Sequence, residues 1–195
     1  MSNGIYTGIT PEEMKRANDF VSVYAEAEKA PYRAWGATLE KRKQKAAELF
    51  SAGYNCSQSV FAAFCDLTGY DEKAALRLAS SFGGGIARHR DVCGAVSGAA
   101  MVLGMLYGYD KPDKEACKEH YARVSEFLNA FKEANGSLVC RELLQLTAEK
   151  VKHDEKEPTP TERNEAFYKG RPCMHLVISA VELLAKEIEK IENNK

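Results

Sequence analysis

Residues 92–109, VCGAVSGAAMVLGMLYGY, decide the fold of this chain. The segment carries no charge and is barely long enough to span a bilayer as a helix. Its glycines weaken the membrane interpretation, because small residues such as Gly94 and Gly98 let a neighbouring helix approach closely. We therefore expect a buried helix at the centre of a globular protein and no membrane span.

The flanking sequence predicts more helices and no sheet. N-cap residues such as Thr10, Asn55 and Asp71 precede apolar residues at helical spacing, and no segment alternates convincingly with a period of two. The polar stretch 150–165, which contains Pro158 and Pro160, is expected to be a loop. The predicted helices cover residues 10–29, 38–50, 55–68, 71–82, 92–109, 112–134, a short segment from about 140, and 173–192.

These elements predict one all-α domain, a bundle of about seven helices around the Gly/Ala-rich helix. Residues 1–40 would form an N-terminal helical extension packed on the same domain, and residues 41–195 the four-cysteine helical domain. Two helices carry apolar stripes that are expected to face the core, namely Cys117, Tyr121, Val124, Leu128 and Phe131 in one and Val177, Val181, Leu184, Ile188 and Ile191 in the other.

Composition excludes several classes of protein. The 27 basic and 28 acidic residues give a net charge of −1, which argues against a nucleic-acid binder held by bulk charge. The first residues lack the basic start and apolar run of a secretory signal, so we expect a cytoplasmic protein with reduced thiols. The six cysteines therefore need an explanation other than disulfide stapling.

The cysteines divide into two groups. Cys65 and Cys117 lie inside predicted helices on apolar stripes, which is typical of small buried side chains. The other four each fall in the first turn of a predicted helix, where unpaired backbone N–H groups and the positive end of the helix dipole favour a thiolate. These four are Cys56, Cys93, Cys140 and Cys173.

Arginines and glycines accompany these four cysteines and complete the set of candidate site residues. The charges of Arg88, Arg90, Arg141 and Arg171, which lie close in sequence to three of them, would also favour thiolate. The run Gly83, Gly84 and Gly85 predicts a loop that can approach a bound group closely. With Arg88 it could hold a phosphate, but it fits neither G-x-G-x-x-G nor a P-loop, so a turn is favoured.

Since the four cysteines align with the apolar faces of their helices, they could meet in the interior. Four thiolates could then hold an iron–sulfur cluster or a zinc ion, or two of them could cycle between dithiol and disulfide. The chain has no C-x-x-C, which argues against zinc ribbons, thioredoxin and the bacterial ferredoxin run. Six buried thiols with no site remain the simplest alternative.

The ordered motifs resemble a known family. They are NCSQSV at 55–60, FGGG at 82–85, CGAVSG at 93–98, Leu103-Gly104, CRELL at 140–144 and Cys173. Over residues 41–192 they are similar to the C_GCAxxG_C_C family of redox-active proteins, which has four characteristic cysteines. The family's cysteines correspond to Cys56, Cys93, Cys140 and Cys173. The motif here follows the CGAxxG form rather than the GCAxxG order.

The resemblance implies a redox role and allows for a bound prosthetic group. We expect electron transfer through an iron–sulfur cluster, or dithiol chemistry, at the four cysteines, with an iron–sulfur cluster favoured over zinc and no cofactor as a further alternative. The partner would be a redox protein or a small-molecule oxidant or reductant, and any enzyme would be an oxidoreductase. A non-catalytic metal-binding or helical interaction module with a structural thiolate site remains the alternative.

Overall fold

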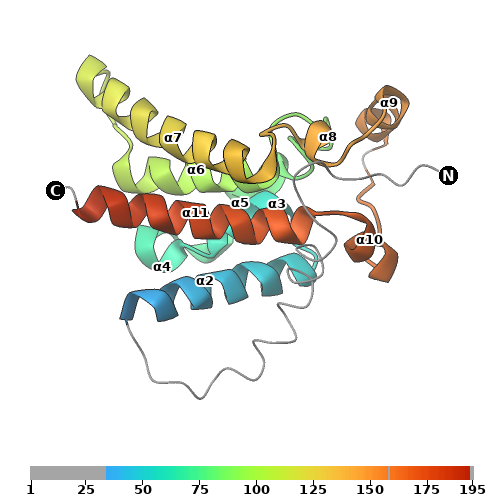
Figure 1. Ribbon diagram of the computed structural model, residues 1–195, viewed down its shortest axis with the longest axis horizontal. Helices are drawn as coiled ribbons and strands as arrows, with labels where there is room; N and C mark the ends of the chain where they lie inside the picture. The colour runs from blue at the N-terminus through green and yellow to red at the C-terminus, as the bar shows by residue number, and fades with distance from the viewer. Residues whose placement is uncertain (1–33, 158, 194–195) are drawn as a thin grey trace.

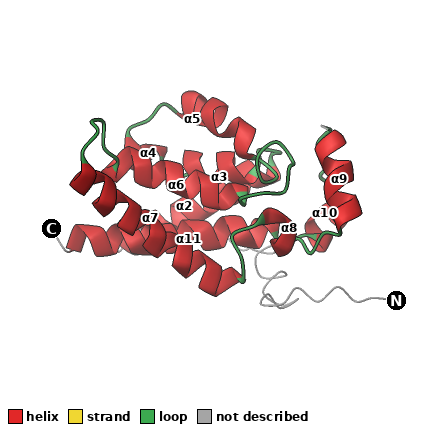
Figure 2. Ribbon diagram, turned by 90° about the horizontal axis from the view of Figure 1, so that it is seen from above, coloured by secondary structure: helices red, strands yellow, loops and turns green. Residues whose placement is uncertain are grey.

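The computed structural model describes residues 34–157 and 159–193, and over these ranges the chain is a bundle of α-helices without strands (Figure 2). The expected all-α class is confirmed. The helix predicted over residues 10–29 lies outside the described residues, as does most of the predicted extension. The described helices are α2 (Ala34–Ser51), α3 (Cys56–Ala62), α4 (Cys65–Thr68), α5 (Glu72–Ala79), the 3-10 helix η1 (Ser80–Phe82), α6 (Gly94–Tyr107), α7 (Lys114–Asn135), α8 (Cys140–Leu143), α9 (Ala148–Lys156), α10 (Glu165–Gly170) and α11 (Cys173–Asn193).

The long helices α2, α6, α7 and α11 run side by side, and the short helices α8, α9 and α10 gather at the end of the bundle where α11 begins (Figure 1). The predicted stripe of α11 is confirmed, because all five of its residues are buried. The largest fully buried side chains include Phe50, Phe61, Phe64, Phe127 and Phe131.

Helix α6 is buried over its first part and packs against α3, as its small residues predict. A Cβ at Gly98 would lie 2.6 Å from the carbonyl oxygen of Ser57, so only glycine permits this approach. Toward the end of α6 the helix reaches the surface, where Met105 is 44% exposed. No helix in the described part of the chain is long and apolar enough to cross a membrane.

The predicted stripe of α7 is wrong at Tyr121, which is 61% exposed. Helix α7 has 22 residues whereas its neighbour α6 has 14, and the first part of α7 leaves the bundle (Figure 1). Apolar spacing identifies the face of a helix but not how far along its length a neighbour covers that face. Cys117 is likewise only half-buried, while Phe127 and Phe131 are fully buried.

The prediction of a loop over residues 150–165 is also wrong, since α9 occupies its first part and α10 begins at its end. Thr147 caps α9 by accepting a hydrogen bond from the Lys150 N–H at 3.3 Å. The buried residue of α9 is Asp154, a carboxylate. A helix anchored by charge shows no apolar period, which is why the sequence resembles a loop.

Candidate functional site

The four cysteines begin or cap helices, as the sequence predicts. Cys56, Cys140 and Cys173 are the first residues of α3, α8 and α11, and Cys93 is the N-cap of α6. Ahead of Cys56, the side chain of Asn55 accepts a hydrogen bond from the Gln58 N–H, and the Gln58 side chain accepts one from the Asn55 N–H, both at 3.0 Å. This is the predicted capping box.

The fold brings these four cysteines to the wall of one small internal cavity. Its volume of about 20 Å³ is close to the space of a single water molecule. Cys65 and Cys117 do not line it. The walls consist of Cys56, Cys93, Cys140 and Cys173 with Gly84, Arg90, Gly94, Leu143, Leu144 and Leu176.

Two glycines allow the elements around this cavity to approach closely. A Cβ at Gly94 would lie 3.2 Å from the Cβ of Cys56, and one at Gly85 would lie 2.8 Å from the Cβ of Cys140. Gly85 also has φ +70°, a conformation that other residues adopt only with strain. Glycine at these positions therefore keeps the segments that carry the thiols in contact.

A short backbone link joins the segments of Cys93 and Cys140. The Cys93 N–H donates to the carbonyl oxygen of Leu138 at 2.8 Å, and the Cys140 N–H donates to that of Asp91 at 2.6 Å. An isolated antiparallel bridge between Val92 and Val139 lies between these bonds. The inner two thiols are thus held by main-chain bonds rather than by side-chain packing alone.

The loop before Cys93 contains an unusual run of left-handed backbone. Beyond Gly84 and Gly85, the angle φ is positive at Ile86, Ala87, Arg88 and Arg90. Such conformations cost energy for residues with a Cβ, and they concentrate at functional sites. The run places the side chains of Arg88 and Arg90 beside the same carboxylate.

That carboxylate belongs to Asp154 of α9, whose side chain is only 1% exposed. It accepts from Arg88 Nη2 at 2.9 Å and from Arg90 Nη2 at 2.8 Å, and it pairs with Lys150 Nζ at 3.0 Å. Burial alone would raise the pKa of Asp154, but the Lys150 hydrogen bond and the arginine charges lower it to about 2. Arg90 Nη1 also lies 4.0 Å from the Sγ of Cys140.

The other two predicted arginines lie apart from this cluster. Arg141 pairs with Asp91 at 3.0 Å on the surface and does not line the cysteine cavity. Arg171 lines a larger outer pocket, and its guanidinium carbon lies 5.0 Å from the centre of the Phe167 ring.

Burial opposes the expected stabilisation of thiolate at the two inner cysteines. It raises the pKa of Cys93 to about 12, although the backbone N–H groups of Ala95 and Val96 act in the opposite direction. It also raises the pKa of Cys140 to about 11, against the charges of Arg90 and Arg171. The expectation that all four helix starts favour thiolate is therefore wrong, because desolvation outweighs the helix terminus at these positions.

The pKa values of Cys56 and Cys173 are shifted in opposite directions. The interaction between their side chains raises the pKa of Cys56 and lowers that of Cys173 to about 7. The charges of Arg171, Arg90 and Arg163 further favour the Cys173 thiolate. Both residues are half-buried and neither is in a disulfide. Cys56 therefore holds its proton more firmly than Cys173 does.

An outer pocket of about 300 Å³ reaches this pair from the surface but does not reach the inner two cysteines. Cys93 and Cys140 are only 3% and 7% exposed. The pocket is lined by Phe50, Asn55, Cys56, Ser80, Gly83, Gly84, Ala87, Arg88, Arg90, Pro160, Thr161, Arg163, Phe167, Arg171 and Cys173.

The four thiols have the chemistry of metal ligands, but their spacing does not match a single metal ion. Four thiols around one cavity are ligands that iron and zinc accept. Within residues 34–157 and 159–193, however, no three His, Cys, Asp or Glu side chains are close enough together to hold a metal ion. The arrangement does not fit one tetrahedral ion, whose bonds to sulfur measure about 2.3 Å.

The sequence did not indicate two residues of this region, Asp154 and Arg163. Both lie in the stretch interpreted as a polar loop. Arg163 lines the outer pocket and contributes to the low pKa of Cys173. The local signal available was the N-cap at Thr147, which marks a helix but not its buried carboxylate.

One solved structure shares this fold. It is described as "A novel iron centre in the split-Soret cytochrome c from Desulfovibrio desulfuricans ATCC 27774". The TM-score is 0.51 at 17% sequence identity, and the match covers 78% of this chain and 70% of that one. This likeness shows the helical fold alone. No curated protein matches the chain.

A family model matches residues 54–187, the part of the chain that contains all four cavity cysteines, the glycine loop and the Arg90–Asp154 pair. Its description is "Putative redox-active protein (C_GCAxxG_C_C)". The predicted resemblance is thereby confirmed, and the chain belongs to the C_GCAxxG_C_C family.

Proposed function

We propose that this protein is a thiol-based oxidoreductase in which Cys56 and Cys173 form the reactive dithiol. The observation that carries the proposal is that, of the four cavity cysteines, these two line the outer pocket. An attacking thiolate beside a resolving thiol is the arrangement that thiol–disulfide exchange requires. The other two cysteines of the cavity have no such access.

In the proposed reaction a substrate disulfide, RSSR, accepts two electrons. The Cys173 thiolate attacks one substrate sulfur, so that a Cys173–SR bond forms, the substrate S–S bond breaks and RS⁻ departs. The Cys56 thiol gives its proton to this departing thiolate, and its sulfur then attacks the Sγ of Cys173 and expels the second RS⁻. The products are a Cys56–Cys173 disulfide, RSH and RS⁻, so atoms, charge and electrons balance.

The surroundings divide the roles between the two thiols. The charges of Arg171 and Arg90 favour the thiolate at Cys173, and a pKa of about 7 keeps much of it ionised at neutral pH without a large loss of nucleophilicity. Cys56, with its raised pKa, retains the proton that the leaving group needs. The buried Cys93 and Cys140 would support the pair from within.

A second candidate function is an iron–sulfur electron carrier that uses all four cysteines. It is favoured by the convergence of four thiols on one cavity, and the iron centre named for the split-Soret cytochrome agrees with it. Cys56, Cys93, Cys140 and Cys173 would be the ligands, and the bound cluster would supply one-electron transfer. Because the thiols are not spaced for a single ion, zinc is the weaker metal candidate.

The first test is the metal and sulfide content of protein purified without oxygen, with an absorbance spectrum of the same sample. Metal-free protein supports the dithiol. Iron with matching sulfide supports the electron carrier and contradicts the dithiol, whereas zinc alone, lost together with the fold on chelation, supports a structural site.

The second test treats the reduced protein with a small disulfide and maps the product by mass spectrometry. We expect a Cys56–Cys173 disulfide in the wild type, and a trapped Cys173 mixed disulfide in Cys56→Ser. Cys65→Ser is the matched control, because Cys65 lies outside the cavity, and it should react like the wild type. Oxidation at other cysteines, or equal reaction of Cys173→Ser, contradicts the proposal.

A further inference from the structure

The outer pocket in front of Cys56 and Cys173 is strongly basic. Four arginines line it, and no aspartate or glutamate does so. This composition is unusual beside thiols, because a chain with a net charge of −1 has no general excess of basic residues. The arginines are Arg88, Arg90, Arg163 and Arg171.

Nearby carboxylates do not neutralise this charge. Asp154 lies behind the pocket and is shared by Arg88, Arg90 and Lys150. Glu157 is exposed and does not line the pocket. Within the described residues, Arg163 and Arg171 form no ion pair with a carboxylate. The pocket therefore carries an uncompensated positive charge beside the Cys173 thiolate.

Neutral contacts hold the two unpaired guanidinium groups in place. Arg163 donates to the carbonyl oxygens of Phe50 and, at 2.8 Å, Tyr54, and its guanidinium carbon lies 4.2 Å from the centre of the Phe50 ring. Arg171 lies over Phe167. Aromatic faces fix a guanidinium without cancelling its charge.

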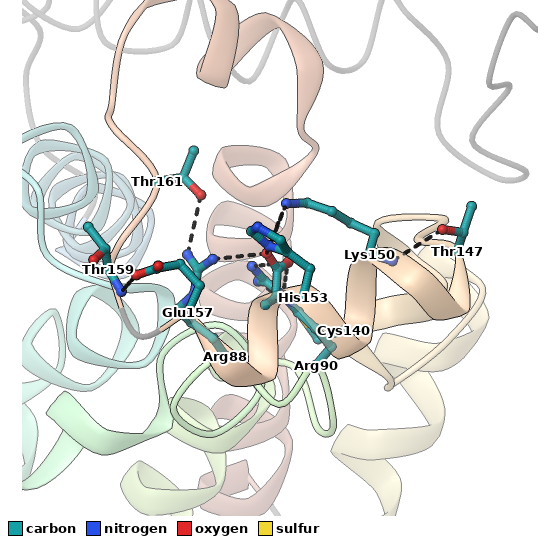
Figure 3. Close-up of polar contacts among 10 residues, drawn as sticks. Arg88, Arg90, Cys140, Thr147, Lys150, His153, Glu157, Thr159 and Thr161 are labelled. Carbon is teal, nitrogen blue, oxygen red and sulfur yellow. Dashed lines mark hydrogen bonds and ion pairs between the residues drawn. The ribbon is translucent and has the colours of Figure 1, made fainter.

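One buried donor at the pocket also lacks an acceptor. The Nε of Arg88 is buried without a hydrogen-bond partner, although the same side chain donates to Asp154 at 2.9 Å and to Thr161 at 3.3 Å (Figure 3). This Nε is closed to the pocket as well as to water, so Arg88 faces a ligand only through the rest of its side chain.

We infer that the pocket binds a small organic anion, whose carboxylate or phosphate group is held by Arg88, Arg163 and Arg171 while its sulfur faces Cys173. The inference rests on the proposed dithiol function and names its substrate class, an anionic low-molecular-weight disulfide. A volume of about 300 Å³ suits a small molecule. The apolar parts of the wall, from Phe50, Ala87 and Phe167, would contact its carbon chain.

Three symmetric disulfides that differ in charge test the inference. Dithiodipropionate carries two carboxylates, bis(2-hydroxyethyl) disulfide is neutral, and cystamine carries two ammonium groups. At low salt we expect dithiodipropionate to oxidise the Cys56–Cys173 pair about tenfold faster than the neutral compound, with cystamine slowest. Equal rates for the anionic and neutral compounds would overturn the inference.

The variant Arg171→Gln should lower the ratio of the anionic rate to the neutral rate about threefold or more, and Arg171→Lys should restore most of it. Using the ratio removes any general change in the reactivity of Cys173, because both substrates share that thiol. Arg123→Gln is the matched control, because Arg123 lies on α7 outside the pocket. An unchanged ratio in Arg171→Gln would contradict the assignment of Arg171.

Calorimetry with suberate separates the failure of this inference from that of the proposed function. Suberate has the length and carboxylates of dithiodipropionate but no sulfur, so it reports binding without reaction. Saturable binding that Arg171→Gln weakens and Arg123→Gln does not would support the anion site, even if no disulfide oxidises the protein. Absence of suberate binding, together with oxidation that ignores substrate charge, would overturn the anion site and leave the dithiol in place.

Discussion

Replacing the buried carboxylate of Asp154 with an amide, in Asp154→Asn, should destabilise the protein strongly. Asp154 is 1% exposed and pairs with three cations at 2.8 to 3.0 Å. The side chain of Arg90 is only 4% exposed, whereas that of Lys150 is 46% exposed and can return to water. The variant therefore leaves two guanidinium groups poorly compensated, that of Arg90 and that of Arg88, whose side chain is 14% exposed.

The size of the effect follows from these buried charges. Removing one partner of a buried ion pair typically lowers the free energy of unfolding by about 3–5 kcal/mol. Because Lys150 can return to water, we expect a loss at the lower end of this range, about 3 kcal/mol at pH 7. The pKa of Asp154 is lowered from 3.8 to about 2. The stabilisation is therefore complete above about pH 5 and is lost as the pH falls through about 2, so the two proteins should converge in acid.

Urea unfolding at pH 7, 5 and 3, followed by circular dichroism, measures this difference. Glu165→Gln is the control, since Glu165 pairs with Lys169 on the surface, where we expect no measurable change. A loss below about 1 kcal/mol at pH 7 would refute the reasoning, because it would mean that the pair is effectively hydrated. A difference independent of pH would equally show that the charge of Asp154 is not its cause.

Two further substitutions and one alkylation assay test the site. Gly85→Ala should lower the free energy of unfolding, measured with urea, by about 2–3 kcal/mol, because its Cβ would lie 2.8 Å from that of Cys140. The control Gly69→Ala, at φ +65° in open space, should lower it by only about 1 kcal/mol. Asn55→Ala removes a capping box and should cost about 1–2 kcal/mol by the same assay, and a loss of a few tenths would contradict this. Alkylation of Cys173 by iodoacetamide should accelerate through about pH 7 and then level off, while a midpoint near pH 9 would mean that its thiolate is not stabilised.

Local signals determined where the helices of the site begin. Asn55 and Gln58 lie three residues apart, and their reciprocal capping of α3 depends only on neighbours in the sequence. The apolar stripe of α11 follows from the same short-range patterns, as do the small residues that let α6 approach a neighbouring helix closely. The all-α class and the helix-start positions of the four cysteines could therefore be predicted from the sequence.

Only the tertiary structure decided how the four thiols differ. By sequence they form one class, because each begins or caps a helix. Folding buries Cys93 and Cys140, while Cys56 and Cys173 line a basic pocket. Desolvation and Coulomb interactions depend on distances between segments far apart in the chain, and short-range sequence patterns do not contain those distances.

The same reason explains the anchoring of α9. Its buried residue is charged, and the arginines that compensate Asp154 lie more than sixty residues earlier in the chain. Apolar periodicity records burial only when the buried residue is apolar. The sequence by itself thus determined the helices and the cysteines at their starts, whereas tertiary folding decided which thiols a substrate can reach and which charges face it.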